Sequence, residues 1–201
     1  LLNTIAQGTD IVYRLGVSIE HSIKKYAAVA PEDYAKFAEI CAGVIRHYNK
    51  GWADGYHLNI KYWEVWNEPD CVPNMWEKSM NDYYEMYAVV AKRLKSEFPE
   101  IRIGGLVTTH LNQEYIMSFL GKCITENAPV DFISWHKYGA VVRDFVAEPF
   151  RARALLDAFG FRQTELHLNE WHYLPCSWSA IRSTSESRRY WLTASEGMQG
   201  I

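Results

Sequence analysis

Strand-forming and helix-forming segments alternate regularly along this chain. Five runs rich in β-branched and aromatic residues recur, at residues 11–19, 60–68, 101–108, 131–138 and 165–171. Their starts are 49, 41, 30 and 34 residues apart, close to the roughly 30 residues or more that a strand–helix–strand unit needs. Each interval therefore leaves room for one helix, and the repeat predicts a parallel sheet covered by helices.

The intervals between these runs carry helical patterns. Pro31 suits the first turn of a helix whose apolar residues recur at i, i+3 and i+4 until Gly51 stops it. A second helix is predicted from about Asn81, a suitable N-cap, with Pro99 beyond its end. Weaker patterns predict further helices at residues 111–125, 151–159 and 186–198. The predicted order is a strand followed by a helix, five times.

Two architectures contain such a repeat, a doubly wound open sheet and a (β/α)8 barrel. The nucleotide-binding fingerprints of open sheets are absent, because neither G-x-G-x-x-G nor G-x-x-x-x-G-K-[ST] occurs. In a barrel, catalytic groups lie where the strands end, at the C-terminal face. Polar residues gather at those ends here: Glu20 and His21, Asn67 and Glu68, Thr108 and His110, His136 and Tyr138, Asn169 and Glu170. We therefore predict one α/β domain, residues 1–201, that forms part of a TIM barrel.

Charge and hydropathy exclude other classes of protein. The chain has 21 Lys and Arg against 24 Asp and Glu, a formal net charge of −3, and it lacks a polybasic cluster. This balance argues against a nucleic-acid binder and against a membrane anchor. No run approaches the roughly 18 apolar residues of a membrane span, and residues 1–10 show no targeting segment, so we predict a soluble protein. The compartment, the oligomeric state and the natural start of the chain stay open.

Cysteine and histidine spacing gives no sign of a metal site. Cys41, Cys71, Cys123 and Cys176 include no C-x-x-C pair, which predicts free thiols rather than a zinc site or a dense disulfide framework. Several isolated histidines also lack metal-ligand spacing: His47, His57, His110 and His172.

Two acids at strand ends carry the clearest chemical signal. Glu68 follows Asn67 and precedes Pro69, which ends the strand ladder and leaves the acid facing the barrel mouth. Glu170 ends a later strand, 102 residues further along the chain. Two acids that face each other across a barrel mouth suit glycoside hydrolysis, in which one protonates the leaving oxygen and the other attacks the sugar or activates water.

Four motifs resemble those of the clan A glycoside hydrolases. They are WEVWNEPD from Trp63, the pair Gly104-Gly105, DFISWHKYG from Asp131 and LNEW from Leu168. Within the clan, the chain most resembles glycoside hydrolase family 39, which contains β-xylosidases and α-L-iduronidases. The resemblance implies that Glu68, at the end of the fourth strand, is the acid/base. It implies that Glu170, at the end of the seventh strand, is the nucleophile.

The same resemblance implies roles for three further residues. Asn67 would bind the sugar 2-hydroxyl, and His136 and Tyr138 would match a pair on the sixth strand, with Tyr138 orienting the nucleophile. The motifs correspond to strands three to seven and leave no material for strands one, two and eight, whereas a full barrel takes about 250 residues. We therefore expect a partial barrel, from a larger protein or an incomplete gene product.

Other residues near the strand ends have two interpretations each. Glu20 and His21 either line the sugar site or form a loop pair at the barrel rim. Trp171 and Trp66 either stack on a sugar or pack between strand and helix. Glu64 lies deeper on its strand than Glu68, which favours a buried, hydrogen-bonded acid over a catalytic one.

The function predicted from the sequence is a retaining glycosidase. It would act on an oligosaccharide or glycoside with a β-linked, xyloside-like sugar, by double displacement and without a metal or other cofactor. Two alternatives remain, a non-catalytic carbohydrate-binding relative and an inactive truncated fragment. The identity of the sugar and the choice between exo and endo action stay open.

Overall fold

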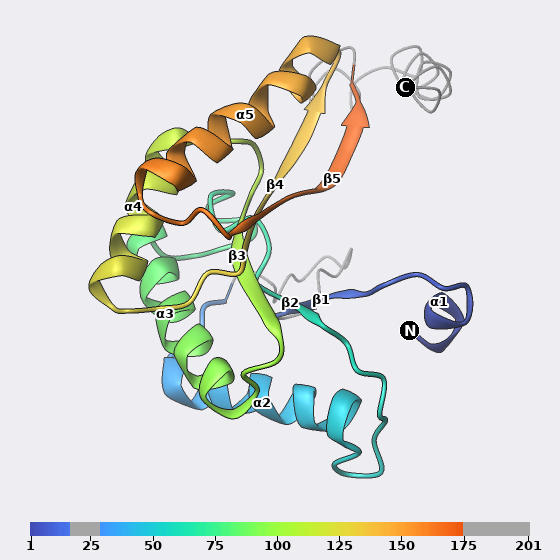
Figure 1. The fold of residues 1–201 in the computed structure, drawn as a ribbon. Coiled ribbons are helices and arrows are strands. Elements are labelled where there is room, and N and C mark those ends of the chain that lie inside the picture. Colours follow the sequence, from blue (N-terminus) through green and yellow to red (C-terminus); the bar gives the residue numbers. More distant parts are fainter. Residues whose placement is uncertain (17–28, 175–201) are drawn as a thin grey trace.

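Five parallel strands form one curved sheet. The computed structural model describes residues 1–16 and 29–174. Within these ranges the strands are β1 (Val12–Leu15), β2 (Tyr62–Val65), β3 (Arg102–Thr108), β4 (Phe132–Gly139) and β5 (Glu165–Tyr173). They lie side by side in chain order, and every neighbouring pair is parallel (Figure 1). The predicted partial barrel and its five strands are confirmed.

Four long helices cover one face of this sheet (Figure 1). They are α2 (Tyr34–Lys50), α3 (Met80–Glu97), α4 (Gln113–Thr125) and α5 (Val142–Ala158). A short helix, α1 (Leu2–Ala6), was not predicted and lies apart from them. The face of the sheet opposite the four helices is called the inner face below. The helix predicted at 186–198 lies outside the described residues.

Local hydrogen bonds explain where the helices begin. Helix α2 starts after Asp33, whose side chain accepts the Lys36 N–H, so Pro31 lies before the helix. Asn81 was predicted as the next N-cap, but it lies inside α3. The cap is Ser79, which forms a capping box with Asp82: the Ser79 hydroxyl accepts from the Asp82 N–H, and the Asp82 carboxylate accepts from the Ser79 N–H. These two reciprocal bonds outweigh the single amide of Asn81.

Helix α5 differs most from the prediction, because it begins nine residues before position 151 and continues through Pro149. Proline removes one backbone hydrogen bond, which is why the sequence alone favoured a later start. Tertiary contacts hold the first half of the helix in place. Glu148 is buried and accepts hydrogen bonds from Trp135 Nε1 (3.1 Å) and Lys137 Nζ (2.6 Å) on β4.

The two adjacent glycines of β3 are required by close packing on both faces of the strand. A Cβ atom on Gly104 would lie 2.3 Å from the carbonyl oxygen of Phe132 on β4. A Cβ atom on Gly105 would lie 2.7 Å from the hydroxyl of Tyr83 on α3. Both distances are far below ordinary contact, so the pair allows β3 to approach its neighbouring strand and the covering helix together.

Tyr83 joins the ends of β2 and β3. Its hydroxyl donates to the Val65 carbonyl (3.0 Å) and accepts from the Leu106 N–H (2.9 Å). The side chain is fully buried, and this burial raises the pKa of Tyr83 well above its usual value, so the hydroxyl remains protonated. Tyr83 therefore fixes the strand end from which Glu68 follows.

We expect Tyr83→Phe to lower the free energy of unfolding of the full-length protein by about 1–3 kcal/mol, because the buried Leu106 N–H loses its acceptor. Urea-induced unfolding measures this change. Tyr84→Phe is the matched control, since the buried Tyr84 hydroxyl makes one long bond among residues 1–16 and 29–174, of 3.4 Å to the Tyr115 carbonyl. Equal losses in the two variants would contradict the bridging role of Tyr83.

Three of the four cysteines can be compared with the prediction of free thiols. Cys41, Cys71 and Cys123 are free, as predicted, and burial raises the pKa of Cys41 and Cys123 to about 12. Cys176 lies outside the described residues. Among the helices of residues 1–16 and 29–174, none is long and apolar enough to cross a membrane.

Candidate active site

Glu68 lies in the loop that follows β2. Its backbone N–H donates to the Val107 carbonyl at the end of β3 (2.9 Å), which ties the loop to the neighbouring strand. The residue has a φ of +45°, in the left-handed region that residues other than glycine rarely adopt. Two residues further on, the Asp70 carboxylate accepts from the N–H and hydroxyl of Thr109, which holds the other side of the loop. These contacts of the loop with the end of β3 therefore fix the backbone position of Glu68.

Glu170 lies on β5, in register with His136 on β4. The hydroxyl of Tyr138 donates to Glu170 Oε1 at 2.8 Å. Burial raises the pKa of Tyr138, and the hydrogen bond to Glu170 and the charge of that acid raise it further. The hydroxyl of Tyr138 consequently stays protonated and remains a donor to Glu170.

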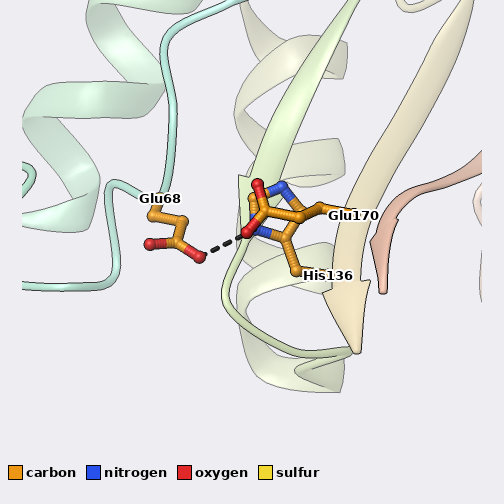
Figure 2. A group of neighbouring side chains, drawn as sticks. All are labelled: Glu68, His136 and Glu170. Atoms are coloured by element: carbon orange, nitrogen blue, oxygen red, sulfur yellow. Dashed lines mark hydrogen bonds and ion pairs between the residues drawn. The ribbon is translucent and has the colours of Figure 1, made fainter. Parts of the chain in front are cut away.

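His136 connects the two acids. Its Nδ1 lies 2.7 Å from Glu68 Oε1 and 3.7 Å from Glu170 Oε1, and its side chain is completely buried (Figure 2). One carboxylate oxygen of Glu68 and one of Glu170 lie within 4.8 Å of each other. Two acids 102 residues apart in sequence therefore meet at one place, as the strand-end pattern predicts.

This spacing is chemically informative. Retaining glycosidases hold their two carboxyl groups about 5 Å apart, whereas inverting enzymes separate them by roughly 6.5–9.5 Å to admit a water molecule. The limit of 4.8 Å between one oxygen of Glu68 and one of Glu170 is compatible with the shorter separation. Glu68, His136 and Glu170 also form the one group of potential metal ligands in the part of the chain that the structure describes.

Asn67 presents an unsatisfied polar atom beside Glu68. The residue is 8% exposed, and its Oδ1 is buried without a hydrogen-bond partner among the described residues. A buried amide oxygen without a donor is costly, so the Asn67 side chain is polar without being satisfied by the described residues. His136 Nε2 is buried and unpartnered in the same sense.

Glu64 lies within β2, before the strand end that precedes Glu68. It is 1% exposed and accepts from Arg14 Nε (2.8 Å) and Asn169 Nδ2 (2.6 Å), so the interpretation as a buried, hydrogen-bonded acid is confirmed. The sequence did not single out Arg14. A charged residue in the middle of a short apolar strand was the available signal, because such a residue needs a partner.

The remaining predicted residues differ in where they lie. Trp171 is half exposed and lies edge-on to Phe145 of α5, with ring centroids 6.2 Å apart, so its proposed place in the sugar site stays a prediction. Trp66 is buried and donates from Nε1 to the Met75 carbonyl, which agrees with the packing alternative. Glu20 and His21 lie outside the described residues.

Comparison with known proteins identifies relatives over most of the chain. The model of the glycosyl hydrolases family 39 matches residues 18–159. A β-xylosidase of Geobacillus stearothermophilus is 34% identical over 112 residues, which make up 54% of this chain and 21% of the relative. A β-xylosidase of Caldicellulosiruptor saccharolyticus is 28% identical over 134 residues, or 67% of this chain and 25% of the relative.

A solved structure has a similar fold. The glucosidase of Croceicoccus marinus matches with a TM-score of 0.74 and 29% identity, over 84% of this chain and 36% of that one. The present chain spans about a fifth to a quarter of the length of the two β-xylosidases.

Proposed function

Because the chain belongs to glycosyl hydrolase family 39, we propose that it carries both catalytic acids of a retaining glycoside hydrolase. The observation that supports this most directly is the spacing of at most 4.8 Å between an oxygen of Glu68 and one of Glu170. At that separation one acid can reach the anomeric carbon while the other reaches the leaving oxygen, as a retaining mechanism requires.

The two acids have different roles in this proposal. Glu170 is the nucleophile, because Tyr138 donates to its Oε1 and orients the carboxylate. Glu68 is the acid/base, and the short contact with His136 Nδ1 fixes its carboxyl group. Both contacts come from residues of β4, which is buried over residues 132–136, so the pair is held by a strand of the sheet.

The reaction then proceeds in two displacements. Glu170 attacks the anomeric carbon while Glu68 gives a proton to the departing glycosidic oxygen, and a covalent glycosyl-enzyme forms. Glu68, now a carboxylate, takes a proton from water, and the resulting hydroxide attacks the same carbon and releases Glu170. Two inversions leave the product with the configuration of the substrate.

Asn67 supplies the third contact with the sugar. Its Oδ1 is buried and has no partner among the described residues, and the side chain would turn toward the site so that the amide oxygen accepts a hydrogen bond from the sugar 2-hydroxyl. Hydrogen bonds to this hydroxyl strengthen in the transition state of glycoside hydrolysis, so an amide oxygen beside the acid contributes to rate as well as to binding.

The substrate that we propose is a glycoside with a β-linked, xyloside-like sugar. Support comes from the two similar proteins named β-xylosidase and from the near-neutral charge of the chain, which suits an uncharged sugar. No metal or other cofactor takes part in the proposed steps, because the two carboxyl groups provide the proton donor and the nucleophile.

Product stereochemistry tests the proposal. We expect the full-length protein to hydrolyse 4-nitrophenyl β-D-xylopyranoside and to release β-xylose first, as followed by proton NMR before mutarotation. Initial release of the α-anomer would contradict the retaining mechanism. Binding of xylo-oligosaccharides by calorimetry without any hydrolysis would favour the carbohydrate-binding alternative.

A further inference from the structure

An irregularity in β5 lies directly before Glu170. Trp135 of β4 is in register with Leu168, but the next residue, His136, is in register with Glu170. Asn169 is therefore an extra residue, a bulge without a partner on β4. Neighbouring residues of a regular strand point to opposite faces of a sheet, and a bulge removes this constraint.

The bulge places two consecutive side chains on the inner face. Glu170 lies beside His136 there, and Asn169 reaches across to Glu64 of β2, with 2.6 Å between Asn169 Nδ2 and Glu64 Oε1. Glu64 belongs to the same face. It pairs with Gly104 of β3, which in turn pairs with Phe132 of β4. Phe132 and His136 are an even number of residues apart on β4, so they point to the same face. A regular β5 would turn either Asn169 or Glu170 away from this face.

Glu64 is well suited to hold the bulge. Its second oxygen, Oε2, accepts from Arg14 Nε at 2.8 Å, so the carboxylate is buried with both oxygens bonded. Hydrogen bonds to an ionised group are shorter and stronger than those between neutral groups. The contacts join the neighbouring strands β1 and β2 to β5, which lies further along the sheet, so they fix β5 relative to the strand that precedes Glu68.

We propose that Glu64 and Asn169 are positioning residues for the nucleophile. Glu64, paired with Arg14, holds the Asn169 side chain in the bulge, and the bulge directs Glu170 toward His136, Tyr138 and the sugar. This inference rests on the proposed role of Glu170 but assigns no contact with the substrate to either residue. Without the bond, β5 relaxes toward regular register, in which Asn169 replaces Glu170 opposite His136.

A donor–acceptor exchange tests this proposal in the full-length protein. In Asn169→Asp two carboxylates face each other, and we expect kcat for 4-nitrophenyl β-D-xylopyranoside to fall about 10- to 100-fold, with KM nearly unchanged, because the nucleophile is misplaced. In Asn169→Asp combined with Glu64→Gln, the new amide donates to Asp and its oxygen still accepts from Arg14. The double variant should recover most of kcat.

Asp131→Asn is the matched control. This carboxylate lies before β4, at the opposite end of the strands, where it accepts from the Ile103 N–H (2.8 Å) and pairs with Lys95 (2.9 Å). We expect it to lower stability and leave kcat unchanged. A double variant no more active than Asn169→Asp alone, or a single variant with wild-type kcat, would overturn the positioning role.

A crystal structure of Asn169→Asp separates this inference from the proposed function. We expect loss of the bulge, or displacement of the Glu170 carboxylate from Tyr138. An unchanged Glu170 position would refute the inference even if the wild-type protein is an active glycosidase. If the wild-type protein hydrolyses no glycoside, the proposed function fails, and the position of Glu170 in this variant alone decides the positioning role.

Discussion

Glu170→Ala should abolish the turnover of 4-nitrophenyl β-D-xylopyranoside by the full-length protein. The expected loss in kcat is roughly 10⁴- to 10⁶-fold, the size found when a covalent nucleophile is removed from other enzymes. The physical reason is that no other carboxylate of the described residues lies with Glu68 and His136 at this place, so the glycosyl-enzyme cannot form. Steady-state kinetics with a chromogenic leaving group measures the change.

A second carboxylate on the same strand provides the control. Glu165 begins β5, where it contacts His167 (3.1 Å) at the end of the strand away from Glu170. Glu165→Ala should retain most of the activity. Cleavage of the activated xyloside by Glu170→Ala at a rate near that of the wild type would refute the nucleophile assignment. Labelling of a different residue by a 2-deoxy-2-fluoro xyloside would refute it independently.

Glu68→Ala should show a loss that depends on the leaving group. For a glycoside with a basic leaving group, kcat/KM should fall about 10²- to 10⁴-fold, because the departing oxygen no longer receives a proton. The 2,4-dinitrophenolate of a 2,4-dinitrophenyl xyloside leaves without that proton, so the first displacement on this substrate should be nearly unaffected. Kinetics over a series of leaving groups measures this difference.

Azide identifies the role of each acid. In Glu68→Ala, azide enters the space of the missing carboxylate and attacks the glycosyl-enzyme, so activity should return with formation of the β-glycosyl azide. In Glu170→Ala, azide replaces the nucleophile on the opposite face of the sugar, so the product should be the α-azide. If Glu68→Ala gave the α-azide and Glu170→Ala gave the β-azide, the assignment of acid/base and nucleophile would be reversed.

Much of the fold was predictable because it depends on local patterns. The five strands follow from runs of β-branched and aromatic residues, and their parallel pairing follows from helix-length intervals. Helix starts were less predictable. Ser79 rather than Asn81 caps α3, since a reciprocal pair of bonds with Asp82 is more favourable than a single one. Helix α5 crosses Pro149, because the buried Glu148 is bonded to β4.

The sequence alone determined that the strands follow one another in chain order. It also determined that the two acids lie at strand ends, because parallel strands bring their carboxyl ends to one edge of the sheet. Period-two alternation likewise predicts that His136 and Tyr138 share a face. The family resemblance implied that Tyr138 contacts Glu170, whereas the contact of His136 with Glu68 was decided only by the tertiary structure. His136 contacts Glu68 and Tyr138 contacts Glu170.

The physical reason lies in the register of β5. The offset of one residue at Asn169 brings Glu170 opposite His136, and it is associated with a bond to Glu64, 105 residues earlier in the chain. Local propensity contains no information about such a contact, since it depends on how three strands meet inside the curved sheet. The sequence therefore determined which residues could form the site, and tertiary packing decided their partners.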